Sequence, residues 1–171
     1  MSGPRAVLVG PMGAGKSTVG ELLARSWGVA ARDTDADVEA LEGRTISDIF
    51  VESGEAHFRD LERKAVAEAL ATHDGVLALG GGAVLDPATR DLLDGQTVVF
   101  LRVGLADAVK RVGLGTSRPL LLGNVRGRIK ALLDERTPVY ESVATLVVDT
   151  DGRTPDEVAA EILDRLGPAP A

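Results

Sequence analysis

The feature that most constrains this chain is a glycine-rich segment near its N-terminus, residues 10–17, with the sequence GPMGAGKS. It follows a short β-branched apolar run and precedes an amphipathic stretch, so it lies between an expected strand and an expected helix. It matches the pattern G-x-x-x-x-G-K-[ST] at every required position. Glycines let the backbone wrap around phosphate oxygens, and the helix N-terminus adds positive partial charge. We therefore predict a phosphate-binding loop; a glycine-rich turn with a chance Gly-Lys-Ser is the alternative.

In such a loop, two side chains carry the nucleotide chemistry. The ammonium of Lys16 reaches the β- and γ-phosphates, and the hydroxyl of Ser17 ligates Mg²⁺. The sequence thus predicts ATP or a related nucleotide, with Mg²⁺, as the first ligand.

The rest of the chain alternates short apolar runs with longer amphipathic stretches. This pattern predicts an α/β fold in which helices cover both faces of a parallel sheet. We expect strands at residues 6–9, 29–32, 76–79, 97–101 and 145–148. We expect helices at about 16–27, within 35–71, from 87, and at 105–112, 126–140 and 155–166. There is no internal repeat or linker, so we predict one domain over residues 1–171.

Composition excludes several classes of function. The chain has no cysteine and two histidines, which excludes disulfides, thiolate zinc sites and a cysteine nucleophile. A net charge of −7 argues against a nucleic-acid partner. The apolar runs are too short to span a bilayer, and the first residues lack the apolar core of a secretion signal, so we expect a cytoplasmic protein without a membrane partner.

Two carboxylates follow the expected second strand, in Asp33-Thr34-Asp35. The strands at 76–79 and 97–101 are followed by Gly80 and Arg102, so neither offers an acidic residue. Ligands of α/β proteins bind at the carboxyl edge of the sheet, where one carboxylate would face Mg²⁺ and the other the phosphoryl acceptor. Capping of the next helix is the alternative role for each. The guanine-specific N-K-x-D signature is absent, which disfavours a GTPase switch.

Four further motifs follow in order: Phe58-Arg59, Gly80-Gly81-Gly82, Arg118-Pro119-Leu120-Leu121 and Arg136-x-Pro138-x-Tyr140. Together with the glycine-rich loop and Asp33-Thr34-Asp35, they closely resemble shikimate kinase, a relative of the nucleoside monophosphate kinases, over about residues 6–166. The resemblance implies a P-loop NTPase fold with a five-stranded parallel sheet in the order 2-3-1-4-5. It also implies a substrate-binding helical region at about 33–62 and a lid at about 113–125.

The same resemblance implies an activity. The chain would phosphorylate the 3-hydroxyl of shikimate with ATP and Mg²⁺, on the route to chorismate and the aromatic amino acids, and it would act as a monomer. The resemblance places Asp35 at the reacting hydroxyl and Arg118 of the lid at the transferring phosphoryl group. Asp33 would hold magnesium through water.

The remaining contacts implied by the resemblance fall into two groups. The ATP-binding residues would be Gly13, Ala14, Gly15, Lys16, Ser17, Thr18, Arg111, Arg118 and Arg153. The substrate-binding residues would be Asp35, Phe50, Phe58, Arg59, Gly80, Gly81, Gly82 and Arg136. Surface charge is the alternative role for Arg111 and Arg153, and core packing is the alternative for the two phenylalanines.

Arg136 is notable from the sequence itself. It shares one helical stripe with Ile129, Leu132, Leu133 and Tyr140. A guanidinium on an apolar face is costly unless it is paired, and either a bound carboxylate or an internal salt bridge would pair it. Arg59 lies among acidic residues, so a solvated helix face is its alternative setting.

The charge distribution supports an anion-binding region. Residues 111–136 contain six Arg or Lys and two acids, although the whole chain carries −7. The alternatives to a shikimate kinase are a related kinase for another polyol acid, such as gluconate, and a P-loop switch or assembly ATPase.

Overall fold

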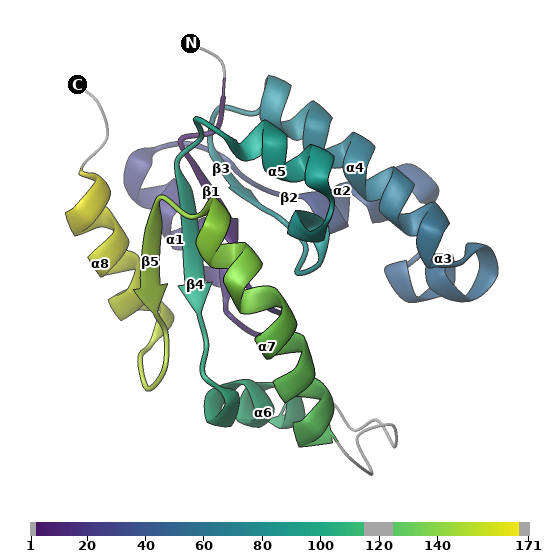
Figure 1. The fold of residues 1–171 in the computed structure, drawn as a ribbon. Helices are drawn as coiled ribbons and strands as arrows, with labels where there is room; N and C mark the ends of the chain where they lie inside the picture. The colour runs from purple at the N-terminus through teal and green to yellow at the C-terminus, as the bar shows by residue number, and fades with distance from the viewer. Residues whose placement is uncertain (1–2, 115–124, 168–171) are drawn as a thin grey trace.

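The computed structural model describes residues 3–114 and 125–167 and contains a parallel five-stranded sheet in the order β2-β3-β1-β4-β5, as predicted (Figure 1). The strands are β1 (Ala6–Val9), β2 (Ala31–Asp33), β3 (Val76–Ala78), β4 (Val98–Arg102) and β5 (Leu146–Asp149). The helices are α1 (Lys16–Trp27), α2 (Thr34–Glu42), α3 (Ile46–Ser53), α4 (Glu55–Thr72), α5 (Pro87–Leu93), α6 (Leu105–Leu114), α7 (Val125–Val143) and α8 (Pro155–Leu166), with a 3₁₀ turn η1 (Ala83–Leu85).

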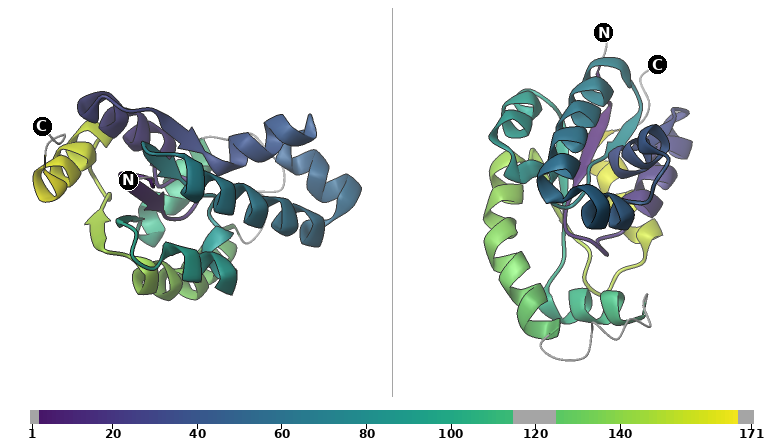
Figure 2. Two further views of the ribbon diagram at one scale, coloured as in Figure 1. Left: turned by 90° about the horizontal axis from the view of Figure 1, so that it is seen from above. Right: turned by 90° about the vertical axis from the view of Figure 1, so that its right-hand side faces the viewer.

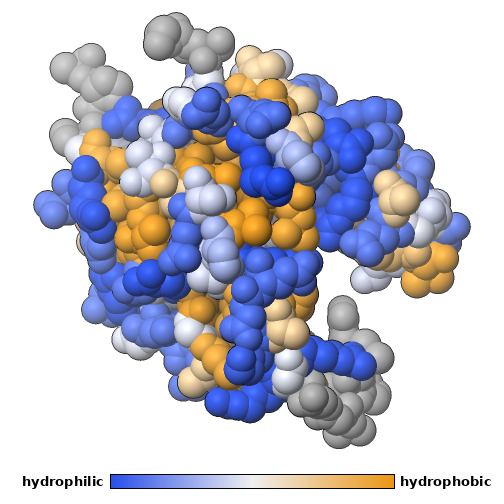
Figure 3. Space-filling model, in the orientation of Figure 1, coloured by the Kyte–Doolittle hydropathy of each residue, from blue (hydrophilic) through white to orange (hydrophobic). Residues whose placement is uncertain are grey.

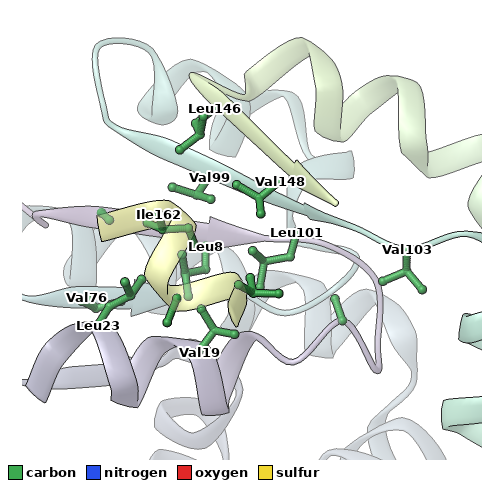
Figure 4. Close-up of a cluster of buried hydrophobic side chains, with 14 of the residues drawn as sticks. Leu8, Val19, Leu23, Val76, Val99, Leu101, Val103, Leu146, Val148 and Ile162 are labelled. Carbon is green, nitrogen blue, oxygen red and sulfur yellow. The ribbon is translucent and has the colours of Figure 1, made fainter. Parts of the chain in front are cut away.

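Helices cover both faces of the sheet, because its central strands are apolar on both sides. Alternate residues of β4 face opposite ways: Val99 and Leu101 pack with α1 and α8, whereas Phe100 packs with α4, α5 and α7. Figure 2 shows these two layers of helices, and Figure 4 shows the core between the sheet and α1 and α8. No described helix is long and apolar enough to cross a membrane.

The second strand begins later than predicted, at Ala31 instead of Val29. Gly28, whose backbone is left-handed, caps the C-terminus of α1. The N–H of Val29 then donates to the carbonyl of Ala24 at 2.9 Å. Val29 therefore completes the helix C-terminus, so pairing of β2 with β3 starts two residues further on. The first strand, β1, matches the prediction at both ends, and no other strand end differs from it by more than one residue.

Helix α7 continues past the predicted end at Tyr140 to Val143, with Pro138 inside it. Val139 and Val143 pack against the core on the α5–α7 face, and that burial favours the extra turn. Two other helices begin at clear N-terminal caps: Asp86 caps α5, and Thr154 and Glu157 form the capping box of α8.

Helices α2, α3 and α4 form the predicted helical region, which projects from the β2 side of the sheet (Figure 1). A small separate core of Val38, Ile49 and Phe58 holds these helices together. The surface is hollowed between this region and α7, beyond the carboxyl ends of the strands (Figure 3). Most of the predicted lid, residues 115–124 with Arg118, lies outside the described residues.

Candidate active site

Backbone carbonyl groups of the glycine-rich loop hold the ammonium group of Lys16. The Nζ of Lys16 donates to the carbonyl oxygens of Gly10 at 2.7 Å and Pro11 at 3.0 Å. Burial lowers the pKa of Lys16 to about 8, although the nearby carboxylates of Asp35 and Asp33 favour its charged form. A buried cation held by carbonyl oxygens at a helix N-terminus is a binding site for phosphate oxygens.

Ser17 and Asp33 lie together beside this loop. The Ser17 hydroxyl donates to Oδ2 of Asp33 at 3.1 Å, while Oδ1 of the same carboxylate accepts from the N–H of Asp35 at 2.8 Å. Asp33 is thus the N-cap of α2, the alternative role weighed for it, and it is also a neighbour of Ser17. Its contact with magnesium stays a prediction. One hydroxyl and one carboxylate, with room for water, fit a magnesium ion that keeps much of its hydration shell.

Asp35 points from the first turn of α2 toward the triple-glycine turn. A Cβ at Gly80 would lie 2.5 Å from its Oδ1, so only glycine allows this approach. Burial, together with the nearby charges of Asp33 and Glu62, raises the pKa of Asp35 to about 6. The carboxyl therefore titrates close to neutral pH, which suits a group that accepts a hydrogen bond from a reacting hydroxyl.

Arg59 occupies the other side of the same turn. A Cβ at Gly82 would lie 2.6 Å from its Nη2. Its Nη1 donates to Glu62 at 2.8 Å, and its Nε lies 3.4 Å from Glu55. Glu62 is only 4% exposed, and burial raises its pKa. A solvated helix face was the alternative setting weighed for Arg59. The structure shows a different setting, because the buried carboxylate of Glu62 holds the Arg59 guanidinium at the cleft.

Arg136 reaches the same place from α7, on the opposite side. Its Nε is buried and has no hydrogen-bond partner among the described residues. Its Nη1 would lie 3.7 Å from a Cβ at Gly81. On the same helix Leu133 is buried, whereas Leu132 is 45% exposed and lines the cleft, so the predicted apolar stripe is only partly a core face.

The two phenylalanines form a contact pair, with ring centroids 5.0 Å apart. Phe58 is 3% exposed and belongs to the core of the helical region, so the packing role weighed for it is present. Phe50 is 36% exposed. Both line the cleft, where they form one apolar wall.

These side chains surround one cleft of about 660 Å³. It runs from the phosphate-binding loop, through Asp33 and Asp35, to the two arginines and the triple-glycine turn. One end of the cleft thus offers cations and loop N–H groups for phosphates. The far end offers two guanidinium groups for a carboxylate, and the carboxyl of Asp35 lies between the ends. This arrangement can hold a nucleotide phosphate and a small hydroxy acid side by side.

Comparison with known proteins identifies the family that uses this arrangement. The family described as shikimate kinase matches residues 12–167. A shikimate kinase from Thermobifida fusca (strain YX) is 60% identical over 168 residues, which cover 98% of this chain and 97% of that protein. The chain belongs to the shikimate kinase family. ATP as co-substrate follows from this membership, and the alternatives of a nucleotide switch, an assembly ATPase or a gluconate kinase are set aside.

Solved shikimate kinases share the fold. The enzyme from Acinetobacter baumannii, determined in complex with shikimate, has a TM-score of 0.88 at 34% identity and covers 97% of this chain and 93% of its own. The enzyme from Aquifex aeolicus has a TM-score of 0.84 at 34% identity, with 95% of each chain covered. The family fold predicted from the motifs is therefore confirmed.

The two arginines predicted to flank adenine are held by this chain's own groups. Arg111 donates to the carbonyl of Gly13 at 3.1 Å and to the hydroxyl and carbonyl of Thr150 at 3.0 and 2.9 Å. Arg153 donates to Glu161 at 2.6 Å and to the carbonyl of Asp149 at 2.8 Å. Arg111 thus touches the phosphate-binding loop, whereas Arg153 lies in a structural ion-pair network. Their contact with adenine remains a prediction.

Sequence reasoning assigned no role to three residues that shape the cleft. Glu62 holds Arg59, the buried Thr34 hydroxyl lies 3.4 Å from the N–H of Gly80, and the hydroxyl of Tyr140 donates to the carbonyl of Gly81. Glu62 carried one detectable signal, because it lies three residues after Arg59 on a helix. Nothing local in the sequence pairs Tyr140 with a turn 59 residues away.

Proposed function

We propose that this chain transfers the γ-phosphoryl group of ATP to the 3-hydroxyl of shikimate, with Mg²⁺, on the route to chorismate and the aromatic amino acids. The observation that carries the proposal is the buried Nε of Arg136, which has no hydrogen-bond partner in the described part of the chain. Arg136 lines the cleft together with Arg59. A buried guanidinium N–H without an acceptor is costly, and a ligand carboxylate is the acceptor that removes this cost. The Acinetobacter baumannii relative was determined with shikimate, which carries one carboxylate and three hydroxyls.

At the carboxylate end, Arg59 and Arg136 grip the acid from two different helices. Glu62 fixes the orientation of Arg59 before the ligand arrives, so little side-chain entropy is lost on binding. Phe50 and Phe58 cover the ring of the acid.

At the reacting end, Asp35 accepts a hydrogen bond from the 3-hydroxyl. The hydroxyl oxygen forms a bond to the γ-phosphorus while the bond from that phosphorus to the bridging oxygen breaks, which releases ADP. The proton of the hydroxyl passes to Asp35 or to water. A loose transition state demands little basicity, so Asp35 contributes chiefly by positioning the hydroxyl.

At the phosphate end, the loop N–H groups and Lys16 bind the β- and γ-phosphates. Lys16 exchanges its bonds to the carbonyls of Gly10 and Pro11 for phosphate oxygens. Ser17, and Asp33 through water, would hold Mg²⁺, which supplies charge neutralisation at these oxygens. The resemblance implies that Arg118, which lies outside the described residues, would act on the transferring phosphoryl group.

We also propose that the chain works as one domain and as a monomer in the cytoplasm. The family resemblance supports this proposal, and the described cleft residues already include groups suited to the phosphates, the reacting hydroxyl and the carboxylate.

The test is the variant Arg136→Met, which keeps the apolar stem and removes the guanidinium. We expect the KM for shikimate to rise about 10- to 100-fold, as loss of a charge-assisted hydrogen bond predicts, while the KM for ATP changes little. Arg165→Met is the matched control, because Arg165 lies on α8, where it contacts Glu161 and the carbonyl of Val147 away from the cleft. An unchanged KM for shikimate in Arg136→Met would contradict the proposed carboxylate site.

A further inference from the structure

All three carbonyl groups of the triple-glycine turn accept hydrogen bonds from groups of the protein. The oxygen of Gly80 accepts from the N–H of Ala83, and that of Gly82 accepts from the N–H of Leu85, both at 3.1 Å. The oxygen of Gly81 accepts instead from a side chain, the hydroxyl of Tyr140. The turn therefore has one carbonyl whose direction depends on a single distant residue.

The N–H groups of the same turn behave differently. Among residues 3–114 and 125–167, no acceptor meets the N–H of Gly81 or of Gly82. Both glycines line the cleft. With its carbonyls engaged and these two donors free, the turn is a hydrogen-bond donor toward an anionic or hydroxylated ligand.

Tyr140 is well suited to hold the turn. It is 0% exposed, and its ring packs against Phe100 with centroids 5.0 Å apart. Burial raises its pKa, so its hydroxyl keeps the donated proton at neutral pH. The residue comes from α7, one helical turn after Arg136, so a single helix supplies both a cleft guanidinium and the anchor of the turn.

The bond that holds the carbonyl of Gly81 also fixes the direction of the N–H of Gly82. In a trans peptide the C=O of Gly81 and the N–H of Gly82 point in opposite directions. No cis peptide is present among the described residues. Without the Tyr140 bond, this peptide plane can rotate at low steric cost, because neither glycine has a Cβ. Rotation would turn a carbonyl oxygen toward the ligand, where it repels a carboxylate.

We propose that Tyr140 is a positioning residue for substrate binding, which holds the Gly81–Gly82 peptide with its N–H group toward the acid. This inference rests on the proposed function only for the identity of the ligand, shikimate. It assigns the acid's affinity partly to a hydroxyl that lies behind the turn and does not line the cleft.

The first experiment measures the dissociation constant of shikimate by isothermal titration calorimetry, without nucleotide. Tyr140→Phe keeps the ring and removes the hydroxyl, and we expect about three- to tenfold weaker binding, the loss of one modest hydrogen bond. In initial-rate assays the KM for shikimate rises by the same factor, while kcat and the KM for ATP stay within about twofold. Val66→Ala is the control, because Val66 is buried in the same hydrophobic cluster and does not line the cleft. It lowers the melting temperature and leaves shikimate affinity unchanged.

The second experiment separates this inference from the proposed function. In protein labelled with ¹⁵N-glycine, the amide signals of Gly81 and Gly82 report the peptide orientation with no ligand present. We expect both to shift or broaden in Tyr140→Phe and to remain in Val66→Ala. If wild-type protein binds no shikimate, the proposed function fails, yet these signals still test the anchor. If Tyr140→Phe binds shikimate as wild type does and its glycine signals do not move, the positioning role is overturned.

Discussion

Burial of the Asp35 carboxyl suits a role in the reaction but lowers the stability of the folded protein. Its carboxyl is buried beside Asp33 and Glu62, which is why its pKa rises to about 6. The folded protein therefore binds this proton more tightly than the unfolded chain does. Ionised Asp35 consequently opposes folding, and the cost is fully present above about pH 6. A residue held charged against this cost is a strong candidate for chemistry.

The variant Asp35→Asn should separate these two effects. We expect turnover to fall at least about 100-fold, because an amide accepts the reacting hydroxyl poorly and takes no proton. At pH 7.5 we expect the free energy of unfolding to rise by about 1–3 kcal/mol, since the buried charge is gone. Denaturant unfolding measures the free energy of unfolding, and a coupled ADP-release assay measures turnover. Asp37→Asn is the matched control on the same helix, because Asp37 pairs with Arg32 and does not line the cleft. Near-normal turnover in Asp35→Asn would remove this residue from the chemistry.

The same pKa predicts opposite pH trends for activity and stability. Below about pH 6 the protonated carboxyl is a poorer hydrogen-bond acceptor for the reacting hydroxyl, so kcat/KM for shikimate should fall as the pH falls, by up to about tenfold per pH unit. Over the range from pH 7 down to about 4, the Asp35 contribution to stability should become more favourable. A pH–rate profile and unfolding curves at matched pH values test the pair. Two results would contradict the role of Asp35: a kcat/KM for shikimate that does not fall at acidic pH in wild type, or the same acidic fall in Asp35→Asn as in wild type.

At the scale of elements, the β3–η1 turn brings the cleft together. It accommodates Asp35 from α2 at one glycine and Arg59 from α4 at another, and it is anchored to α7 through Tyr140. A short turn at the carboxyl edge of a parallel sheet thus contacts side chains from three helices around one cleft.

Gly82→Ala tests this role of the turn. The added Cβ would lie 2.6 Å from Nη2 of Arg59, so the guanidinium must move. We expect the KM for shikimate to rise about tenfold or more with little change in the KM for ATP. Gly20→Ala is the control, since its methyl meets only Leu8 at 3.4 Å and Val76 at 3.6 Å, and it should leave both constants unchanged. Equal KM values for shikimate in wild type and Gly82→Ala would show that the close approach is not needed.

Local patterns predicted the elements better than they predicted contacts between them. The phosphate-binding loop is continuous in the chain, so its spacing predicted the placement of Lys16 and Ser17. The start of β2 was wrong because the bond from Val29 to Ala24 depends on how α1 ends. The pairing of Tyr140 with Gly81 depends on packing of α7 against the sheet, which residue periodicity does not encode. The roles of Glu62 and Tyr140 therefore came only from the structure.

At the scale of the whole molecule, the order of the strands brings the protein groups proposed to bind the two substrates to one edge of the sheet. Strand β1 leads into the phosphate-binding loop, β2 into Asp33 and Asp35, and β3 into the glycine turn, and β3 lies between the other two. Although the chain is acidic overall, residues 111–136 contain six Arg or Lys and two acids, and Arg136 from this stretch lines the cleft. The cleft therefore offers positive charge to an acid although the whole chain is negative.

The central claim is that this cleft transfers phosphate from ATP to shikimate. The most direct measurement is ADP release coupled to NADH oxidation, with shikimate, gluconate, a nucleoside monophosphate or no acceptor, followed by ³¹P–¹H correlation NMR of the product. We predict release that depends on shikimate, with the phosphorus coupled to the proton on carbon 3. Release that is equally fast without an acceptor, or with gluconate in place of shikimate, would contradict the account.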